Sequence, residues 1–166
     1  MGRGSTHYNT RSLWVLPNNT NFLQTQVTWG VGWGSQFGTN DQQSFYVGID
    51  NATGDAPAQF QLISFDASNV KTTADLGINY SALGNGESFA VLLEIISPRS
   101  YYNSTESRLD VTIYKLDFWG RAEVLGTSRQ LIPSIVNPRL RAVVTTHEAL
   151  AKSLAITYTS LEGAIT

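Results

Sequence analysis

Short apolar segments recur along this chain at close spacing, and clusters of glycine, asparagine, proline and aspartate separate them. Segments of this length between turn-forming residues are typical of strands in a β-sandwich or barrel. The chain shows no internal repeat and no low-complexity tract, so we expect one all-β domain. A single helical turn within 147–154 is the one alternative to strand. The pattern predicts strands near residues 12–16, 22–31, 43–50, 58–65, 87–97, 108–118, 121–131, 139–147 and 152–160.

The composition supports the all-β class. Charged residues make up 14% of the chain, against about 25% in an average soluble domain. The polar surface must therefore come from Thr, Ser, Asn, Gln and Gly, which suit exposed strands and turns better than exposed helices. The chain has no cysteine, which excludes disulfides and thiolate chemistry. We predict an antiparallel β-sandwich of about eight to ten strands, stabilised by its core or by assembly.

The charge pattern argues against nucleic acid as a partner. The formal net charge is −2, and the three lysines are scattered at Lys71, Lys115 and Lys152. Binding to a phosphate backbone needs a basic patch that this sequence lacks. No segment approaches the ~20 consecutive apolar residues of a membrane-spanning helix. We therefore expect neither nucleic-acid binding nor membrane insertion.

Three segments carry distinctive side-chain patterns. In 27–34, large residues alternate with Thr28 and glycines, which predicts close packing against the glycine side. The run Phe89–Ile96 is apolar at every position except Glu94, which predicts a central strand buried on both faces. In 109–118 the apolar positions change parity near Ile113, which predicts a switch of the buried face along that strand, caused by a β-bulge or a twist. The stretch after it, 117–120, predicts a hairpin turn.

Groups that could support catalysis are sparse. His147 is the one histidine away from the N-terminal residues, and no metal-binding or nucleophile motif occurs. Two carboxylates can hydrolyse a glycosidic bond, and Glu94, Asp110 and Asp117 are the candidates. For Glu94, the alternative is a carboxylate that pairs with an arginine or lies at a subunit interface. We predict no enzymatic activity, no metal site and no cofactor.

Two loop signals are weaker. The segment IDNATGDAP, Ile49–Pro57, resembles a calcium-binding loop but lacks the regular alternation of ligands, so we predict a hairpin loop. Four N-glycosylation sequons occur, and we expect each of them in a loop. They are Asn18, Asn51, Asn79 and Asn103.

The segment SPRSYYNSTESR, from Ser97 to Arg108, places two arginines around two adjacent tyrosines. Tyrosine offers a rigid amphipathic ring and arginine a planar fork that fits carboxylates, so both are favoured in binding surfaces. We predict that Arg99, Tyr101, Tyr102 and Arg108 bind a ligand, and an acidic sugar such as sialic acid would suit them. A long hairpin loop that tolerates aromatic residues is the alternative.

The segment SLWVLP, from Ser12 to Pro17, resembles the shaft-to-head junction of adenovirus fibres, in which a Thr-Leu-Trp-Thr segment followed by a proline opens the trimeric head. Leu13 and Trp14 match, and Ser12 replaces the threonine. The segment LAITYTS, Leu154–Ser160, is similar to the last strand of such heads. The short chain fits an avian or reptilian type of fibre, or an analogous trimeric spike from another virus or phage.

The resemblance implies a homotrimeric head on the virion surface, made in the host cell without disulfides, that binds a host receptor. The receptor would be a protein or a sialylated glycan. Residues 1–5, MGRGS, look like the remnant of an expression tag. The resemblance implies that residues 6–11 are the end of a shaft or a linker and that residues 12–166 form the head domain. Four aromatic residues are then expected in the core or between subunits: Trp14, Trp29, Trp119 and Tyr158.

Two other functions stay open at this point. The first is a monomeric carbohydrate-binding module or lectin domain of a larger secreted protein, in which exposed Trp33, Tyr101, Tyr102 or Trp119 would stack on sugar rings. The second is a small glycoside hydrolase that uses the carboxylates named above. A trimer in solution would favour the fibre head over the binding module. Catalytic turnover of a saccharide would favour the hydrolase over both.

Overall fold

The computed structural model describes the chain in nine stretches: residues 6–15, 26–34, 44–53, 59–79, 88–97, 106–117, 119–133, 139–146 and 155–165. These residues form ten strands and no helix, so none of them belongs to a helix that could cross a membrane. The strands are β1 (Thr6–Val15), β2 (Val27–Gly34), β3 (Ser44–Asp50), β4 (Gln59–Phe65), β5 (Lys71–Asn79), β6 (Ser88–Ser97), β7 (Glu106–Leu116), β8 (Ala122–Pro133), β9 (Arg139–Thr146) and β10 (Ala155–Ile165).

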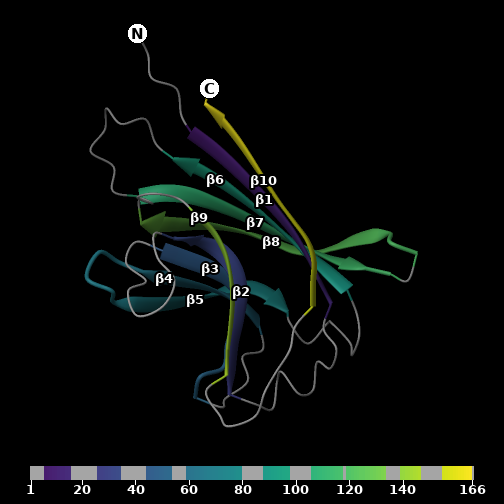
Figure 1. The fold of residues 1–166 in the computed structure, drawn as a ribbon, viewed down its shortest axis with the longest axis horizontal. Coiled ribbons are helices and arrows are strands. Elements are labelled where there is room, and N and C mark those ends of the chain that lie inside the picture. The colour runs from purple at the N-terminus through teal and green to yellow at the C-terminus, as the bar shows by residue number, and fades with distance from the viewer. Residues whose placement is uncertain are drawn as a thin grey trace.

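The strands form two antiparallel sheets that pack against each other (Figure 1). Sheet 1 has the order β10-β1-β6-β7-β8, and sheet 2 has the order β5-β4-β3-β2-β9. On one side of the sandwich, β8 of sheet 1 packs against β5 of sheet 2. The arrangement confirms the predicted antiparallel β-sandwich.

The first and last strands lie side by side. Thr6 of β1 is the Cα partner of Ile165 of β10 on one side and of Ser97 of β6 on the other. Residues 6–11, expected at the end of a shaft or in a linker, are therefore part of β1. Both strands extend further than the sequence pattern predicted.

The prediction missed β5. Its sequence, KTTADLGIN, carries only two buried apolar side chains, Leu76 and Ile78. Most of its other side chains are exposed because β5 lies at the edge of sheet 2. Ala74, Leu76 and Ile78 do alternate with polar residues and glycine, but this alternation covers only the second half of the strand, so the signal is short.

Three aromatic rings join the two sheets in the core. Trp29 of β2 and Phe60 of β4 come from sheet 2, whereas Phe89 of β6 comes from sheet 1. All three are fully buried. The Phe89 ring centroid lies 5.5 Å from that of Trp29 and 5.8 Å from that of Phe60. These distances lie within the 4.5–7 Å range of favourable aromatic pairs, so the trio holds the sheets together.

Glycines in β2 allow it to lie close to β3. A Cβ atom on Gly30 would lie 2.6 Å from the Val47 carbonyl oxygen. A Cβ atom on Gly32 would overlap the Phe45 carbonyl oxygen, and one on Gly48 would overlap that of Trp29. The predicted close packing is therefore confirmed, and the packed neighbour is the backbone of the adjacent strand.

Strand β6 lies between β1 and β7, as a central strand should. Only one of its faces is buried: Phe89, Val91 and Leu93 point into the core, and Ala90 and Leu92 on the other face are partly exposed. The prediction of burial on both faces was wrong. No described strand covers the second face of sheet 1.

A β-bulge lies opposite Ile113, but it is not in the strand for which it was predicted. Ile113 pairs with Gly126 of β8, and the next residue, Tyr114, pairs with Val124, so Leu125 is the extra residue. The bulge belongs to β8, because β7 keeps regular pairing with β6. The expected switch of the buried face is therefore wrong, and Tyr114 lies on the side of β7 away from the core.

Candidate functional site

One face of sheet 1 points away from the core along β6, β7 and β8. On β7, Leu109, Val111 and Ile113 are buried, so the residues between them project to the opposite side. The cross-strand register places residues of β6 and β8 beside them. We call this surface the outer face. Its residues are Ala90, Leu92, Glu94, Arg108, Asp110, Thr112, Tyr114, Leu116, Ala122, Val124, Thr127, Arg129 and Leu131.

A charged row crosses the outer face. Glu94, Asp110 and Arg129 are successive Cα partners on β6, β7 and β8. Arg129 Nε donates a hydrogen bond of 2.8 Å to Asp110 Oδ1, and Arg108 Nη2 lies 3.1 Å from Asp110 Oδ2. The hydrogen bond to Asp110, together with its negative charge, raises the pKa of Arg129. With Glu94, the cluster holds two carboxylates and two guanidinium groups, so its formal charge is zero.

An open polar hollow of about 470 Å³ lies over this row. Thr112 and Thr127 are Cα partners on its floor. The volume is within the range of roughly 300–1,000 Å³ that is common for ligand sites. Hydroxyl, carboxylate and guanidinium groups together provide both donors and acceptors of hydrogen bonds. The lining consists of Glu94, Asp110, Val111, Thr112, Thr127, Ser128 and Arg129.

A second hollow, of about 280 Å³, adjoins the first and is mainly apolar. Leu92 of this hollow is the Cα partner of Thr112 of the polar hollow, so the two meet on β6 and β7. Tyr114 supplies the aromatic ring of the lining. The outer face therefore presents an apolar site directly beside a hydrogen-bonding site. The lining consists of Ala90, Val91, Leu92, Tyr114, Leu116 and Ala122.

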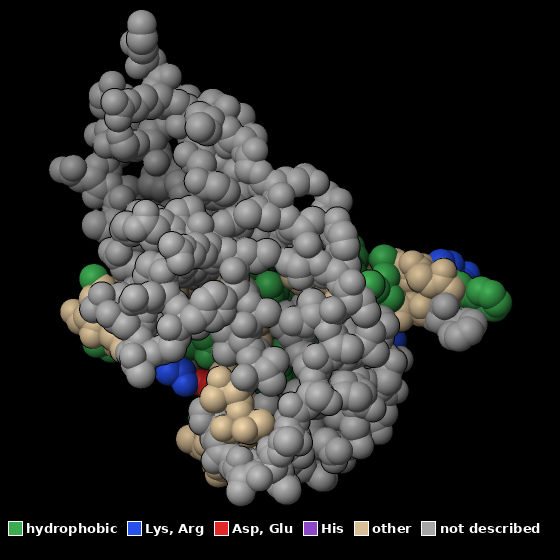
Figure 2. Space-filling view, in the orientation of Figure 1, with side chains coloured by type: hydrophobic (Ala, Val, Ile, Leu, Met, Phe, Trp, Pro, Cys, Tyr) green, Lys and Arg blue, Asp and Glu red, His purple; other side chains and the backbone are tan. Residues whose placement is uncertain are grey.

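The β7–β8 hairpin projects beyond the sandwich (Figure 1), and Figure 2 shows hydrophobic and basic side chains on it. The Asp117 carboxylate accepts hydrogen bonds from the backbone N–H groups of Trp119 and Arg121, at 2.9 and 2.8 Å, and from Arg121 Nε at 2.7 Å. These bonds, led by the Arg121 N–H, lower the pKa of Asp117. Gly120 adopts a φ of +77° within the turn. The predicted hairpin is confirmed, and Trp119 is 77% exposed at its tip.

The structure brings together two of the three carboxylates considered for hydrolysis. Glu94 and Asp110 face each other on β6 and β7. Asp117 lies in the hairpin turn, where Arg121 and backbone donors bind it. Asp110 pairs with Arg108 and Arg129. Among the described residues, no group of three or more His, Asp or Glu could hold a metal ion.

The ligand-binding loop predicted from sequence is described only in part. Arg99, Tyr101 and Tyr102 lie outside the described residues, and so does His147. Arg108 lies on β7, and its guanidinium pairs with Asp110 of the same strand.

The four aromatic residues expected in the core or between subunits have different positions. Trp29 is a core residue, and Trp119 is exposed. Trp14 lies on β1 and Tyr158 on β10, and the positions of their side chains are outside the description.

The sequons also differ from expectation. Asn51 follows β3 in the expected β3–β4 hairpin loop, but its side chain is fully buried, so it is not accessible for glycosylation in the folded chain. Asn79 is the last residue of β5, so the prediction of a loop at this position was wrong. Asn18 and Asn103 lie outside the described residues.

Comparison of the chain with models of known protein families, with curated proteins and with solved structures found no match. We therefore assign function from the chemistry of the outer face and from the resemblance noted in the sequence. Sequence reasoning singled out Glu94, Asp110 and Arg108 of this face but missed Tyr114 and Arg129. One sequence feature could have indicated this face: along β6 and β7, apolar residues occupy both alternating sets of positions, the one that faces the core and the one that faces away.

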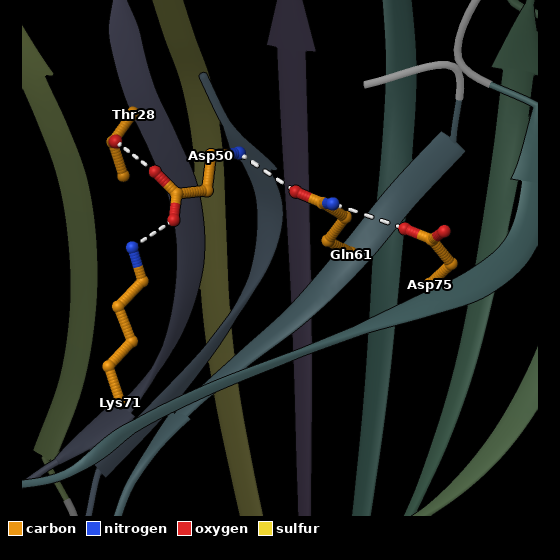
Figure 3. Close-up of polar contacts among 5 residues, drawn as sticks. All are labelled: Thr28, Asp50, Gln61, Lys71 and Asp75. Atoms are coloured by element: carbon orange, nitrogen blue, oxygen red, sulfur yellow. Dashed lines mark hydrogen bonds and ion pairs between the residues drawn. The ribbon is translucent and has the colours of Figure 1, made fainter. Parts of the chain in front are cut away.

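A second polar cluster links four strands of sheet 2 (Figure 3). Thr28 Oγ1 donates a 2.8 Å hydrogen bond to Asp50 Oδ1, and the Lys71 ammonium pairs with Asp50 Oδ2. Gln61 accepts from the Asp50 backbone N–H and donates to Asp75 Oδ1 at 3.1 Å. The Asp50 side chain is only 8% exposed. Because its oxygens already have partners within the chain, we assign this cluster to stability.

The charge of Asp50 makes this cluster sensitive to acid. Burial of Asp50 disfavours its ionised form, but the hydrogen bonds from Lys71 and Thr28 and the charge of Lys71 outweigh that effect. The pKa of Asp50 therefore lies below its ordinary value. The stabilisation is then complete above the unfolded-state pKa of about 3.9 and is lost as the pH falls through the folded-state pKa.

Replacing Asp50 with asparagine should lower the free energy of unfolding near pH 7 by about 1–3 kcal/mol. The difference from the unmodified protein should shrink at about pH 2.5, because the stabilisation from the charge of Asp50 is lost as the pH falls from the unfolded-state pKa towards the lower folded-state pKa. Urea unfolding at both pH values measures this difference. Asp75→Asn, which keeps the oxygen that accepts from Gln61, serves as the control. A difference of equal size at both pH values would contradict the assignment.

Proposed function

We propose that this chain is a non-catalytic attachment domain that assembles as a homotrimer and binds a receptor on the surface of a host cell. The observation that carries the proposal is the outer face, where an apolar hollow and a hydrogen-bonding hollow adjoin on a regular antiparallel sheet. A preformed concave surface with a few polar groups is suited to recognition. Location on a virion is part of the same proposal and rests on the resemblance of SLWVLP to the fibre-head junction.

An exposed apolar side chain at the tip of the β7–β8 hairpin supports assembly. Trp119 is 77% exposed there. Among the described strands, β8 pairs only with β7, so its other edge presents backbone donors and acceptors. Long exposed edges with apolar side chains promote association. A symmetric trimer would bury such surface around its axis.

Molar mass in solution tests the assembly. Light scattering on a size-exclusion column should give about three times 18.2 kDa. Binding of the labelled protein to cultured cells tests attachment. A monomer that still binds glycans would replace the fibre-head proposal with the carbohydrate-binding module.

Replacing Trp119 with serine should weaken the trimer at least about tenfold in dissociation constant, because exposed tryptophans often dominate an interface. Sedimentation equilibrium over a range of protein concentrations measures the effect. Val70→Ser is the matched control, because Val70 is also apolar and 57% exposed but lies in the β4–β5 turn of sheet 2. Association of the Trp119 variant equal to that of the control would remove the hairpin from the interface.

A further inference from the structure

We propose that the outer face binds a neutral saccharide, with Tyr114 in contact with a sugar ring and Thr112, Thr127 and Arg129 hydrogen-bonded to its hydroxyl groups. This inference rests on the proposed attachment function and names the class of its ligand. It moves the predicted binding site from the 97–108 loop to the strands β6–β8. It also replaces the acidic sugar of the sequence prediction with an uncharged one.

The charge balance of the face favours an uncharged ligand. Asp110 lies within 3.1 Å of both Arg108 and Arg129, so both guanidinium groups already have an anionic partner. Glu94 lies directly beside Asp110 in the cross-strand register. A ligand carboxylate would have to compete with the Asp110 carboxylate for both arginines. Like charges brought together in this way oppose binding.

The two hollows match the two kinds of surface on a sugar. A pyranose ring presents apolar C–H groups on one side and hydroxyl groups around its rim. Tyr114 and Leu92 offer an apolar surface in one hollow. Thr112 and Thr127 offer hydroxyl groups in the other. Thr112 lies two residues before Tyr114 on β7 and is the Cα partner of both Leu92 on β6 and Thr127 on β8. One saccharide of two or more rings could therefore use both hollows at once.

The geometry of Arg129 fits a role in recognition. Its Nε donates to Asp110, and its side chain is 70% exposed. Guanidinium groups carry five N–H donors in a fixed plane, so donors remain for a ligand after the bond to Asp110 forms. Asp110 thereby orients Arg129 over the polar hollow, and we assign Asp110 a positioning role.

The experiment uses the complete chain on a glycan array that contains neutral oligosaccharides and their sialylated derivatives, with lactose and 3′-sialyllactose as one matched pair. Display of many copies compensates for weak binding at a single site. We expect binding to neutral oligosaccharides, with no gain from sialylation. Titration calorimetry with the best neutral oligosaccharide then gives the dissociation constant.

Two sets of variants locate the site. Thr112→Val combined with Thr127→Val removes both hydroxyl groups while keeping their shape, and should weaken binding at least about tenfold. Tyr114→Ala should weaken it by a similar factor. The matched control is Thr72→Val combined with Thr73→Val, because both of these threonines are exposed on β5 of sheet 2. The control should bind as the unmodified protein does.

Each contrary outcome has its own meaning. Binding to sialylated glycans alone, or neutral binding that the Thr112/Thr127 variant leaves unchanged, overturns the inference. If a trimer attaches to cells but no saccharide binds, the inference fails while the attachment function stands. If a monomer binds saccharides through these residues, the inference stands and the trimeric head fails. Saccharide cleavage that Glu94→Gln abolishes would support the ligand class and overturn the absence of catalysis.

Discussion

Replacing Phe89 with alanine should lower the free energy of unfolding by about 3–5 kcal/mol, the range for buried phenylalanines. Phe89 is fully buried, and its ring lies 5.5 Å from Trp29 and 5.8 Å from Phe60. Both partners belong to sheet 2, so the substitution removes the sheet 1 member of the trio. Equilibrium unfolding in urea, followed by tryptophan fluorescence and circular dichroism, measures the loss.

Leu131→Ala provides the comparison for Phe89→Ala. Leu131 is a large apolar residue of the same sheet but is 66% exposed. Its removal should change stability by no more than about 0.5 kcal/mol in the monomer, as is usual for surface positions. A loss below about 1 kcal/mol for the Phe89 variant would show that the trio does not join the sheets as described.

Replacing Gly32 with alanine should destabilise the fold by about 3 kcal/mol or more, although it adds a single methyl group. The new Cβ atom would overlap the carbonyl group of Phe45 and the Cα atom of Tyr46 on the neighbouring strand. Backbone atoms in a sheet cannot rotate out of the way as a flexible side chain can. Strands β2 and β3 would have to separate, and their hydrogen bonds would weaken. Urea unfolding measures the loss, and the yield of folded protein gives a second readout.

Gly77→Ala is the control for Gly32→Ala, because at Gly77 an added methyl group strains the backbone but does not overlap a neighbouring strand. Gly77 has a φ of +73°, but a Cβ atom there would meet no atom within 4 Å. Alanine at this position should cost only about 1 kcal/mol, from its left-handed conformation. If the two alanine variants are equally stable, close approach of β3 is not the reason for glycine at position 32.

Local pattern was enough to predict the class of fold and most of its strands. Alternation identified the buried residues of β7, but the parity change near Ile113 suggested a bulge in β7, whereas the bulge lies in β8. The same pattern was misleading about the position of Tyr114. In the sequence, an apolar residue that lines a surface hollow looks the same as an apolar residue in the core. Strand β5 had only a short alternating signal, since Leu76 and Ile78 are the buried apolar residues there.

The candidate site was harder to predict because it depends on register. Glu94 and Asp110 were both recognisable as acids, but only the pairing of β6 with β7 makes them neighbours. Arg129 joins them from a third strand, and its position depends on the bulge in β8. No local rule gives the distance between residues that are far apart in sequence, so the neutral charge of the cluster became visible only in the fold.

The pairing of β1 with β10 also has a consequence for how the chain folds. Thr6 and Ile165 are partners, and β1 lies between β10 and β6 in the interior of sheet 1. The hairpins β3–β4 and β6–β7 connect residues close in sequence and can form early, whereas the β1–β10 contact closes a loop of almost the whole chain. Contacts of such long range slow folding. During synthesis β1 must therefore wait for the last strand to leave the ribosome before sheet 1 is complete.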